Sequence, residues 1–185
     1  YTKQPTVYYG LMYLAKNAKK EVKIHTPYII CNDYMYNELK NIKVPTTIMT
    51  NSAENNGNIF GAVDYLNHKK DIINTGVTIK EYEGGISYHG KSMTIDDDIA
   101  IVGSFNMDMR SAYIDTELML VINSKNINKQ LKASMEEYEK KAATVKNETE
   151  YSHIPEGMKM KELSDKKKNI KAWFGWAMNG LRFLF

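Results

Sequence analysis

Residues 88–106 read YHGKSMTIDDDIAIVGSFN, and this stretch predicts both a fold and a chemistry. Two apolar runs, residues 87–96 and 99–104, flank an Asp-rich turn, which is the pattern of two adjacent antiparallel strands. Side chains two positions apart on a strand point to the same face, so His89 and Lys91 should lie side by side. The first run therefore carries an imidazole next to an ammonium group.

An imidazole beside an ammonium group suits a phosphate ligand. Lys91 can neutralise phosphoryl oxygens as a point charge, and His89 can attack phosphorus or shuttle a proton near neutral pH. The second run ends in a small turn, where Ser104 and Asn106 can offer uncharged donors to the same oxygens. We therefore expect phosphate chemistry at this place.

Helical and strand patterns alternate on both sides of the stretch. Hydrophobic periodicity predicts helices over residues 7–20, 33–42, 59–74 and 124–143, and strands over residues 21–30, 44–51, 77–83 and 116–123. Helices between strands indicate an α/β fold, and the adjacent hairpin strands make its sheet mixed rather than all parallel. The expected architecture is a mixed β-sheet flanked by helices.

The composition is that of a globular protein and excludes several classes. Of 185 residues, 43% are hydrophobic and 25% charged, which excludes wholesale disorder. The single cysteine, Cys31, excludes a disulfide framework and a cysteine zinc cluster, and we expect it in the core. The four histidines show no metal-ligand spacing. A net charge of +3 is too small to argue for nucleic acid.

The C-terminal part differs from the body in charge and pattern. We predict a domain over residues 1–146, a polar linker over residues 147–168 and an amphipathic basic-aromatic helix over residues 169–185. From residue 151 onwards, seven basic and three acidic residues give a charge of +4, so the rest of the chain carries −1. The helix has two interpretations: an interfacial membrane anchor, or a helix docked on the domain or on a missing half.

The 88–106 stretch also carries a family signature. HxKxxxxD followed after six residues by GSxN matches the HKD motif of the phospholipase D superfamily. Residues 107–122, MDMRSAYIDTELMLVI, resemble the second half of bacterial cardiolipin synthases, and residues 20–30, KEVKIHTPYII, resemble the entry to that half. The resemblance covers residues 6–143 and implies a phospholipase D-like half-domain. Because the chain begins at Tyr1 rather than Met, we treat it as a fragment.

The resemblance implies roles for the residues of the motif. His89 would be the nucleophile or the general acid, and its place in a second half assigns it the acid role by analogy. Lys91 and Asn106 would bind phosphate oxygens, and Ser104 would line the same pocket.

Two carboxylates complete the implied site. Asp96 would lie behind the site and support the motif. Glu117 would orient His89 through its other ring nitrogen. Two nearby residues outside the motif, Asp108 and Arg110, are interpreted as a local ion pair.

The implied activity is phosphatidyl transfer or phospholipid phosphodiester hydrolysis through a phosphohistidine, without cofactor or metal. The family needs two HKD motifs, so the partner would be a second half, either a missing N-terminal half or a second copy. A peripheral position at the cytoplasmic face of a bacterial membrane follows from the lipid substrate and the tail. The alternatives are a phospholipase D-family nuclease, which the modest charge disfavours, and a non-catalytic membrane-docking module.

Overall fold

The computed structural model describes residues 3–174, 180 and 182–184. Within them, an eight-stranded sheet has the order β10-β9-β4-β3-β1-β5-β6-β8, and β2 pairs with β7 separately. The strands are β1 (Val22–His25), β2 (Ile29–Ile30), β3 (Thr46–Asn51), β4 (Thr78–Tyr82), β5 (Ser92–Ile95), β6 (Ile99–Gly103), β7 (Met107–Asp108), β8 (Met119–Asn123), β9 (Ala142–Val145) and β10 (Tyr151–His153). The helices are α1 (Thr6–Lys16), α2 (Asp33–Lys40), α3 (Ile59–Ile73), α4 (Met109–Tyr113), α5 (Lys125–Glu139), α6 (Asp165–Phe174) and the 3-10 helix η2 (Arg182–Leu184).

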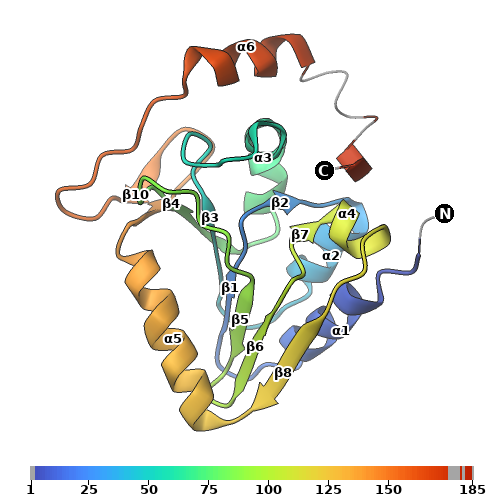
Figure 1. Ribbon diagram of the computed structural model, residues 1–185. Helices are drawn as coiled ribbons and strands as arrows, with labels where there is room; N and C mark the ends of the chain where they lie inside the picture. The colour runs from blue at the N-terminus through green and yellow to red at the C-terminus, as the bar shows by residue number, and fades with distance from the viewer. Residues whose placement is uncertain (1–2, 175–179, 181, 185) are drawn as a thin grey trace.

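The sheet is mixed and is covered on both faces. Strands β1, β3 and β4 run parallel, whereas β5, β6, β8 and the β9–β10 hairpin pair antiparallel with their neighbours. Figure 1 shows α5 on one face and α1, α2 and α3 on the other. The predicted α/β class, a mixed sheet flanked by helices, is therefore confirmed.

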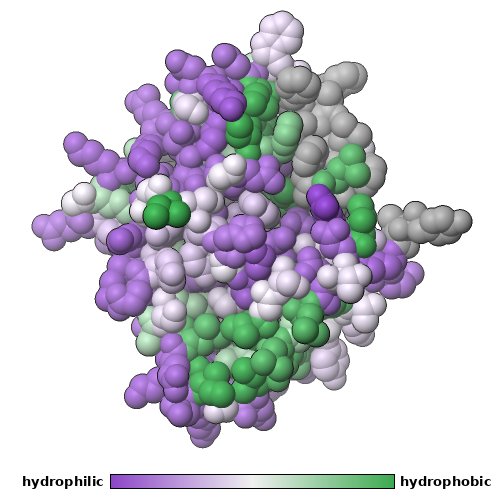
Figure 2. Space-filling model, viewed as in Figure 1, coloured by the Kyte–Doolittle hydropathy of each residue, from purple (hydrophilic) through white to green (hydrophobic). Residues whose placement is uncertain are grey.

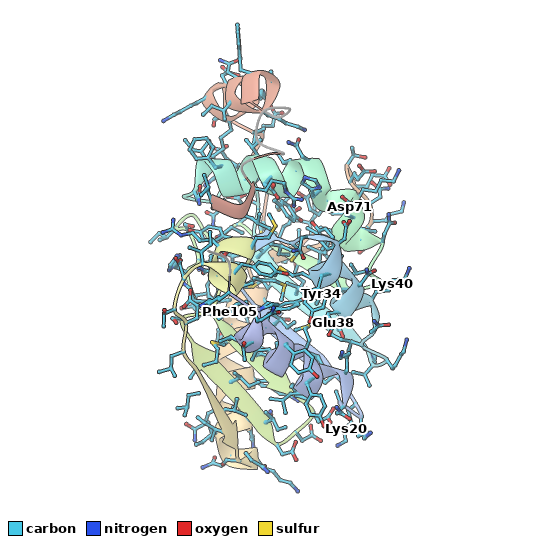
Figure 3. The ribbon with its side chains drawn as sticks, turned by 90° about the vertical axis from the view of Figure 1, so that its right-hand side faces the viewer. Lys20, Tyr34, Glu38, Lys40, Asp71 and Phe105 are labelled. Atoms are coloured by element: carbon cyan, nitrogen blue, oxygen red, sulfur yellow. The ribbon has the colours of Figure 1, made fainter. Side chains whose placement is uncertain are left out.

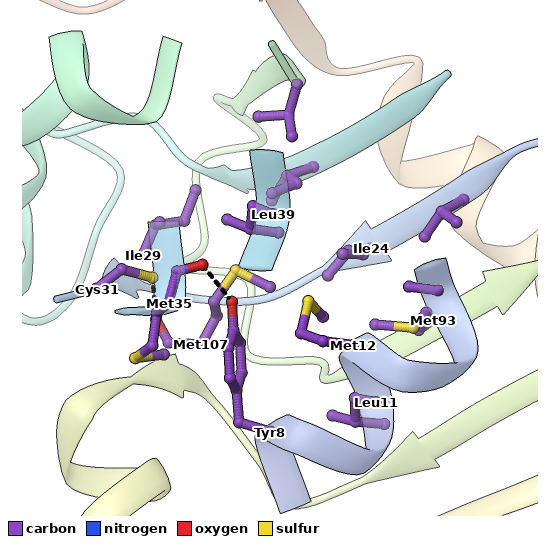
Figure 4. Close-up of a cluster of buried hydrophobic side chains, with 14 of the residues drawn as sticks. Tyr8, Leu11, Met12, Ile24, Ile29, Cys31, Met35, Leu39, Met93 and Met107 are labelled. Atoms are coloured by element: carbon purple, nitrogen blue, oxygen red, sulfur yellow. Dashed lines mark hydrogen bonds between the residues drawn. The ribbon is translucent and has the colours of Figure 1, made fainter. Parts of the chain in front are cut away.

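The larger part of the core lies between the sheet and α1 and α2 (Figure 4). Leu11 and Met12 of α1 are buried there, and each such side chain contributes about 2 kcal/mol by leaving water. The buried Tyr8 hydroxyl donates to the Met35 carbonyl at 2.7 Å, so this hydroxyl has a hydrogen-bond partner inside the core. Cys31 is buried in this cluster, as expected for a core residue.

Helix α1 is shorter than predicted because a carboxylate ends it. It stops at Lys16, where the pattern had suggested residue 20. The backbone N–H groups of residues 19–21 donate instead to the Asp96 carboxylate, so this segment turns toward β1. In Figure 3, α1 lies beside Tyr34 and Glu38 of α2, and Lys16 donates to Glu38 at 2.6 Å.

The C-terminal third departs most from the expected elements. Helix α5 ends at Glu139 rather than at residue 143, and the following residues form β9. Residues 147–168 were predicted to be a polar linker, but they contain β10 and the start of α6, which begins at Asp165 rather than 169. The polar composition gave no sign of strand β10, because this strand is held in part by a polar contact: the Tyr151 hydroxyl donates to the buried carboxylate of Glu81. That these residues link two parts of the protein stays a prediction.

Candidate active site

The segment before β5 carries the first two motif residues. The pattern had placed His89 and Lys91 on a strand, but β5 begins at Ser92. A side chain takes the place of a neighbouring strand: Asn51, at the end of β3, accepts from the Tyr88 N–H at 2.8 Å and donates to the Tyr88 carbonyl at 2.9 Å. This clamp fixes the peptide next to His89.

His89 and Lys91 lie side by side, as expected. The Lys91 ammonium is 2.8 Å from His89 Nδ1 and donates to the His89 carbonyl at 2.9 Å. Partial burial and the Lys91 charge lower the pKa of His89, and burial also lowers the pKa of Lys91. The imidazole is therefore mostly neutral at pH 7 in the chain alone.

Asn106 and His89 line the same hollow of about 290 Å³. The Asn106 Nδ2 donates to Ser111 Oγ at 3.3 Å, and an amide carries a second N–H that a ligand can use. Its Oδ1 is buried without a hydrogen-bond partner among the described residues. The structure thus brings together His89, Lys91 and Asn106, although they come from opposite ends of the motif.

Glu117 lies with the two hydroxyl groups rather than with the imidazole. It accepts from Ser104 Oγ and, at 3.0 Å, from Ser111 Oγ. The antiparallel pairing of β6 and β8 explains this, because it brings the residue before β8 next to the residues after β6. Among the described residues, no hydrogen bond joins Glu117 to His89, so the implied orienting contact is not formed here. Burial lowers the pKa of Lys91, and the Glu117 charge partly offsets that lowering.

Asp96 supports the fold and lies away from the imidazole. It occupies the turn after β5, at the opposite end of that strand from Lys91, with a positive φ of 52°. Three backbone N–H groups reach its carboxylate and lower its pKa against the effect of burial. The implied supporting role fits this place, but a catalytic role does not.

Asp108 has a role that its place in the sequence did not predict. It was expected to pair with Arg110, but Arg110 pairs with Asp115 at 3.1 Å. Asp108 instead caps α4 by accepting from the Ser111 N–H at 2.6 Å. Burial raises the pKa of Asp108 to about 6, and the residue lines the hollow with His89. Aspartate is a preferred N-cap residue, so Asp108 just before a short helix was a signal that could have been recognised.

Comparison with known sequences gives a match over most of the chain. The family described as "Cardiolipin synthase, PLD-like domain" matches residues 11–138. Cardiolipin synthase 1 of Staphylococcus epidermidis (strain ATCC 12228 / FDA PCI 1200) is 30% identical over 157 residues, which are 83% of this chain and 31% of that protein. Cardiolipin synthase 1 of Staphylococcus aureus (strain COL) is 29% identical over the same shares. The chain therefore spans only about a third of the length of these curated relatives.

Solved structures share the fold. Phosphatidylserine synthase of Haemophilus influenzae Rd KW20 superposes with a TM-score of 0.68 at 16% identity, over 95% of this chain and 44% of that one. The phospholipase D family member Nuc of Salmonella typhimurium superposes with a TM-score of 0.60 at 15% identity, over 74% and 89%. The fold is therefore that of a phospholipase D-like half-domain. With the family match, the chain belongs to the cardiolipin synthase PLD-like domain family of the phospholipase D superfamily.

Proposed function

We propose that this chain supplies one of two HKD half-sites for phosphatidyl transfer or phospholipid phosphodiester hydrolysis of the cardiolipin synthase type. The observation that carries the proposal is the convergence of an imidazole, an ammonium group and an amide: His89 Nδ1 is 2.8 Å from Lys91 Nζ, and His89 shares a hollow with Asn106. These groups suit a phosphodiester, whose oxygens Lys91 and Asn106 would bind.

The chemistry needs two imidazoles, one in each half. A ring nitrogen attacks phosphorus and the bond to the departing alcohol breaks, while the other imidazole, protonated, gives its proton to that alcohol. A second alcohol, or water, then gives its proton to that imidazole and attacks the phosphohistidine, which restores both rings. The lowered pKa of His89 suits the role of nucleophile, which requires a neutral ring. The family analogy assigns His89 the role of general acid, and the negative charge of a bound phosphodiester would favour the protonated ring that this role requires.

The second half would cover an apolar surface beside the site. Val102, Leu118 and Leu120, in and just before the paired strands β6 and β8, are exposed, Leu118 to 77%. Figure 2 shows apolar surface gathered over β6 and β8. Val102 also lines a hollow of about 530 Å³ together with His89 and Lys91. A second half seated on this surface would place its own imidazole near the phosphate.

The exposed residues of α6 would meet the membrane. Lys168, Lys171 and Trp173 of this helix are exposed, Trp173 to 83%, and lysines near an aromatic ring suit an anionic lipid surface. No helix among the described residues is long and apolar enough to cross a bilayer. The aromatic residues at 176 and 185, which the sequence adds to this pattern, lie outside the described residues. We propose peripheral binding to the cytoplasmic face of a bacterial membrane.

The test is the full-length protein that contains this chain, assayed for conversion of phosphatidylglycerol to cardiolipin. His89→Ala is expected to lower turnover by about 100-fold or more, because it removes the nucleophile or the acid. His153→Ala is the matched control, since this exposed histidine lies on β10. Release of phosphatidic acid instead of cardiolipin would identify hydrolysis.

Three other outcomes would contradict the proposal. Unchanged lipid turnover in His89→Ala would remove His89 from the chemistry. Cleavage of DNA without any lipid turnover would favour the nuclease, and lipid binding without any turnover would favour the docking module.

A further inference from the structure

One lysine of the C-terminal segment points into the protein. Lys167 of α6 is 7% exposed, although the lysines on either side of it are exposed. Its ammonium donates to the carbonyls of Ala53, Glu54 and Asn56 at 2.8, 2.6 and 3.0 Å. An ammonium has three N–H groups, so Lys167 uses its whole donor capacity on one turn of the chain. The same turn receives the Ser164 N–H on the Glu54 carboxylate at 2.9 Å.

That turn holds the segment that carries His89. Asn55 donates to the Ile86 carbonyl and accepts from the Gly85 N–H, both at 3.1 Å. The Gly57 N–H donates to Ser87 Oγ at 3.1 Å, and Asn55 Nδ2 also reaches the clamp residue Asn51 at 3.1 Å. Residues 84–91 belong to no strand, so these side-chain contacts supply the backbone hydrogen bonds that a neighbouring strand would otherwise provide. The contacts run from α6 through residues 51–57 to the backbone before His89.

A second basic residue of the tail fixes η2 near the same site. The Arg182 guanidinium donates to both carboxylate oxygens of Asp64, at 2.6 and 3.1 Å, and to the Cys31 carbonyl at 2.9 Å. Asp64, on α3, is only 2% exposed, so the pair is a buried bidentate one. This places Leu184 in the wall of the 290 Å³ hollow, whose other described lining residues, His89 included, are polar, charged or aromatic.

We propose that the C-terminal segment, α6 with η2, is a positioning part of the active site, with Lys167 and Arg182 as its positioning residues. Lys167 secures the turn that orients His89, and Arg182 seats Leu184 against the hollow. The proposal rests on the proposed function only in calling His89 catalytic. It leaves the exposed side chains of Lys168, Lys171 and Trp173 free for lipid, since Lys167 alone of these four is buried.

The test uses the 185-residue chain itself, with two NMR readouts: the titration of the His89 ring and the exchange of the Gly85 and Tyr88 amides. Lys167→Met is expected to raise the His89 midpoint toward the ordinary value, because a looser segment is better hydrated. Exchange of both amides should become about 10-fold faster or more, since a charged hydrogen-bond cluster is lost. Lys168→Met, the exposed neighbour, is the control and should change neither.

The charged and titratable groups that share the 290 Å³ hollow with His89 are Tyr28, Asp108, Arg110 and Asp115. Those that share the 530 Å³ hollow are Lys91, which lies beside its ring, and Tyr82, Tyr88 and Tyr138. None is altered by these substitutions, so a shift in the His89 midpoint reports its position. A folded Lys167→Met chain with unchanged titration and exchange overturns the role of Lys167. If that variant does not fold, Asn55→Ala, which cuts the next link, is subject to the same criteria.

Arg182→Gln tests the second contact, with Lys171→Gln as its control. The His89 ring resonances should shift in Arg182→Gln and stay in place in Lys171→Gln, and a folded Arg182→Gln chain without any shift overturns this part. Because neither experiment measures turnover, failure of the proposed lipid chemistry would leave these results unaffected.

Discussion

Replacing Asn51 with alanine removes the side chain that substitutes for a strand beside Tyr88. Asn51 is 1% exposed and makes four hydrogen bonds. Its Nδ2 donates to the carbonyls of Tyr88 at 2.9 Å and Pro27 at 3.3 Å, and its Oδ1 accepts from the Tyr88 N–H at 2.8 Å and from Asn55 at 3.1 Å. Asn51→Ala therefore leaves the Tyr88 N–H and carbonyl without a partner, whereas the Pro27 carbonyl keeps Thr50 and Asn55 keeps the Ile86 carbonyl.

The loss of stability depends on how many of these groups remain inaccessible to water. Each buried group left without a partner costs about 1–3 kcal/mol, and the hollows beside His89 admit water to some of them. We expect Asn51→Ala to lower the free energy of unfolding by about 2–4 kcal/mol. With a urea slope of about 2 kcal/mol per M, the midpoint should fall by about 1–2 M.

Urea unfolding followed by far-UV circular dichroism measures this loss. Asn126→Ala is the matched control, since Asn126 is exposed on α5 and the hydrogen bond of its side chain is with Gln130, one turn along the same helix. The control should stay within about 0.5 kcal/mol of the wild type. If Asn51→Ala behaved like Asn126→Ala, the clamp would contribute nothing and the account of how His89 is held would be wrong.

Three further predictions test other parts of the site and the tail. Because burial raises the pKa of Asp108 to about 6, ionisation of this carboxyl lowers the free energy of unfolding as pH rises from about 4 to 6. Asp108→Asn should remove this pH dependence, so that urea unfolding shows the variant gaining up to about 3 kcal/mol relative to wild type between pH 4 and pH 7. An unchanged pH dependence would refute the prediction. Glu117→Gln should lower the NMR-measured pKa of Lys91 and leave the His89 titration unchanged, whereas a shifted His89 titration would restore the implied pairing. Replacing Lys168 and Lys171 with glutamine should weaken flotation with anionic vesicles by about 30-fold at low salt, at about 1 kcal/mol per lysine, and undiminished binding would contradict the membrane face.

The site formed by the motif could be predicted because its residues are close together in the sequence. His89, Lys91 and Asn106 belong to two consecutive strands and their flanks, so their spacing along the chain alone predicts that they meet. Glu117 depends on the register of β8 against β6, which no spacing in the motif specifies, and its contacts with Ser104 and Ser111 could not be predicted. Asn51 could not be predicted at all, because its partner lies 37 residues away and an asparagine at the end of a strand has no distinctive signature.

The tail shows a different limit. A stripe of basic residues on an apolar helix is the same pattern whether the lysines face lipid headgroups or backbone carbonyls. Lys167 and Arg182 have partners contributed by residues more than a hundred positions away, so only the folded chain distinguishes them from Lys168 and Lys171.

The two margins of the large sheet are unequal, and this has a consequence for handling the chain. One margin, β10, is three residues long and ends in the exposed Ser152 and His153, which offer a neighbouring molecule little to stack on. The opposite margin, β8, is longer, with Leu120 and Val121 exposed. Self-association of the isolated chain should therefore take place at the β8 edge rather than at the β10 edge, and it should increase with protein concentration. Charged residues at positions 120 and 121 would make the chain easier to purify, while the same change in a paired protein would separate its halves.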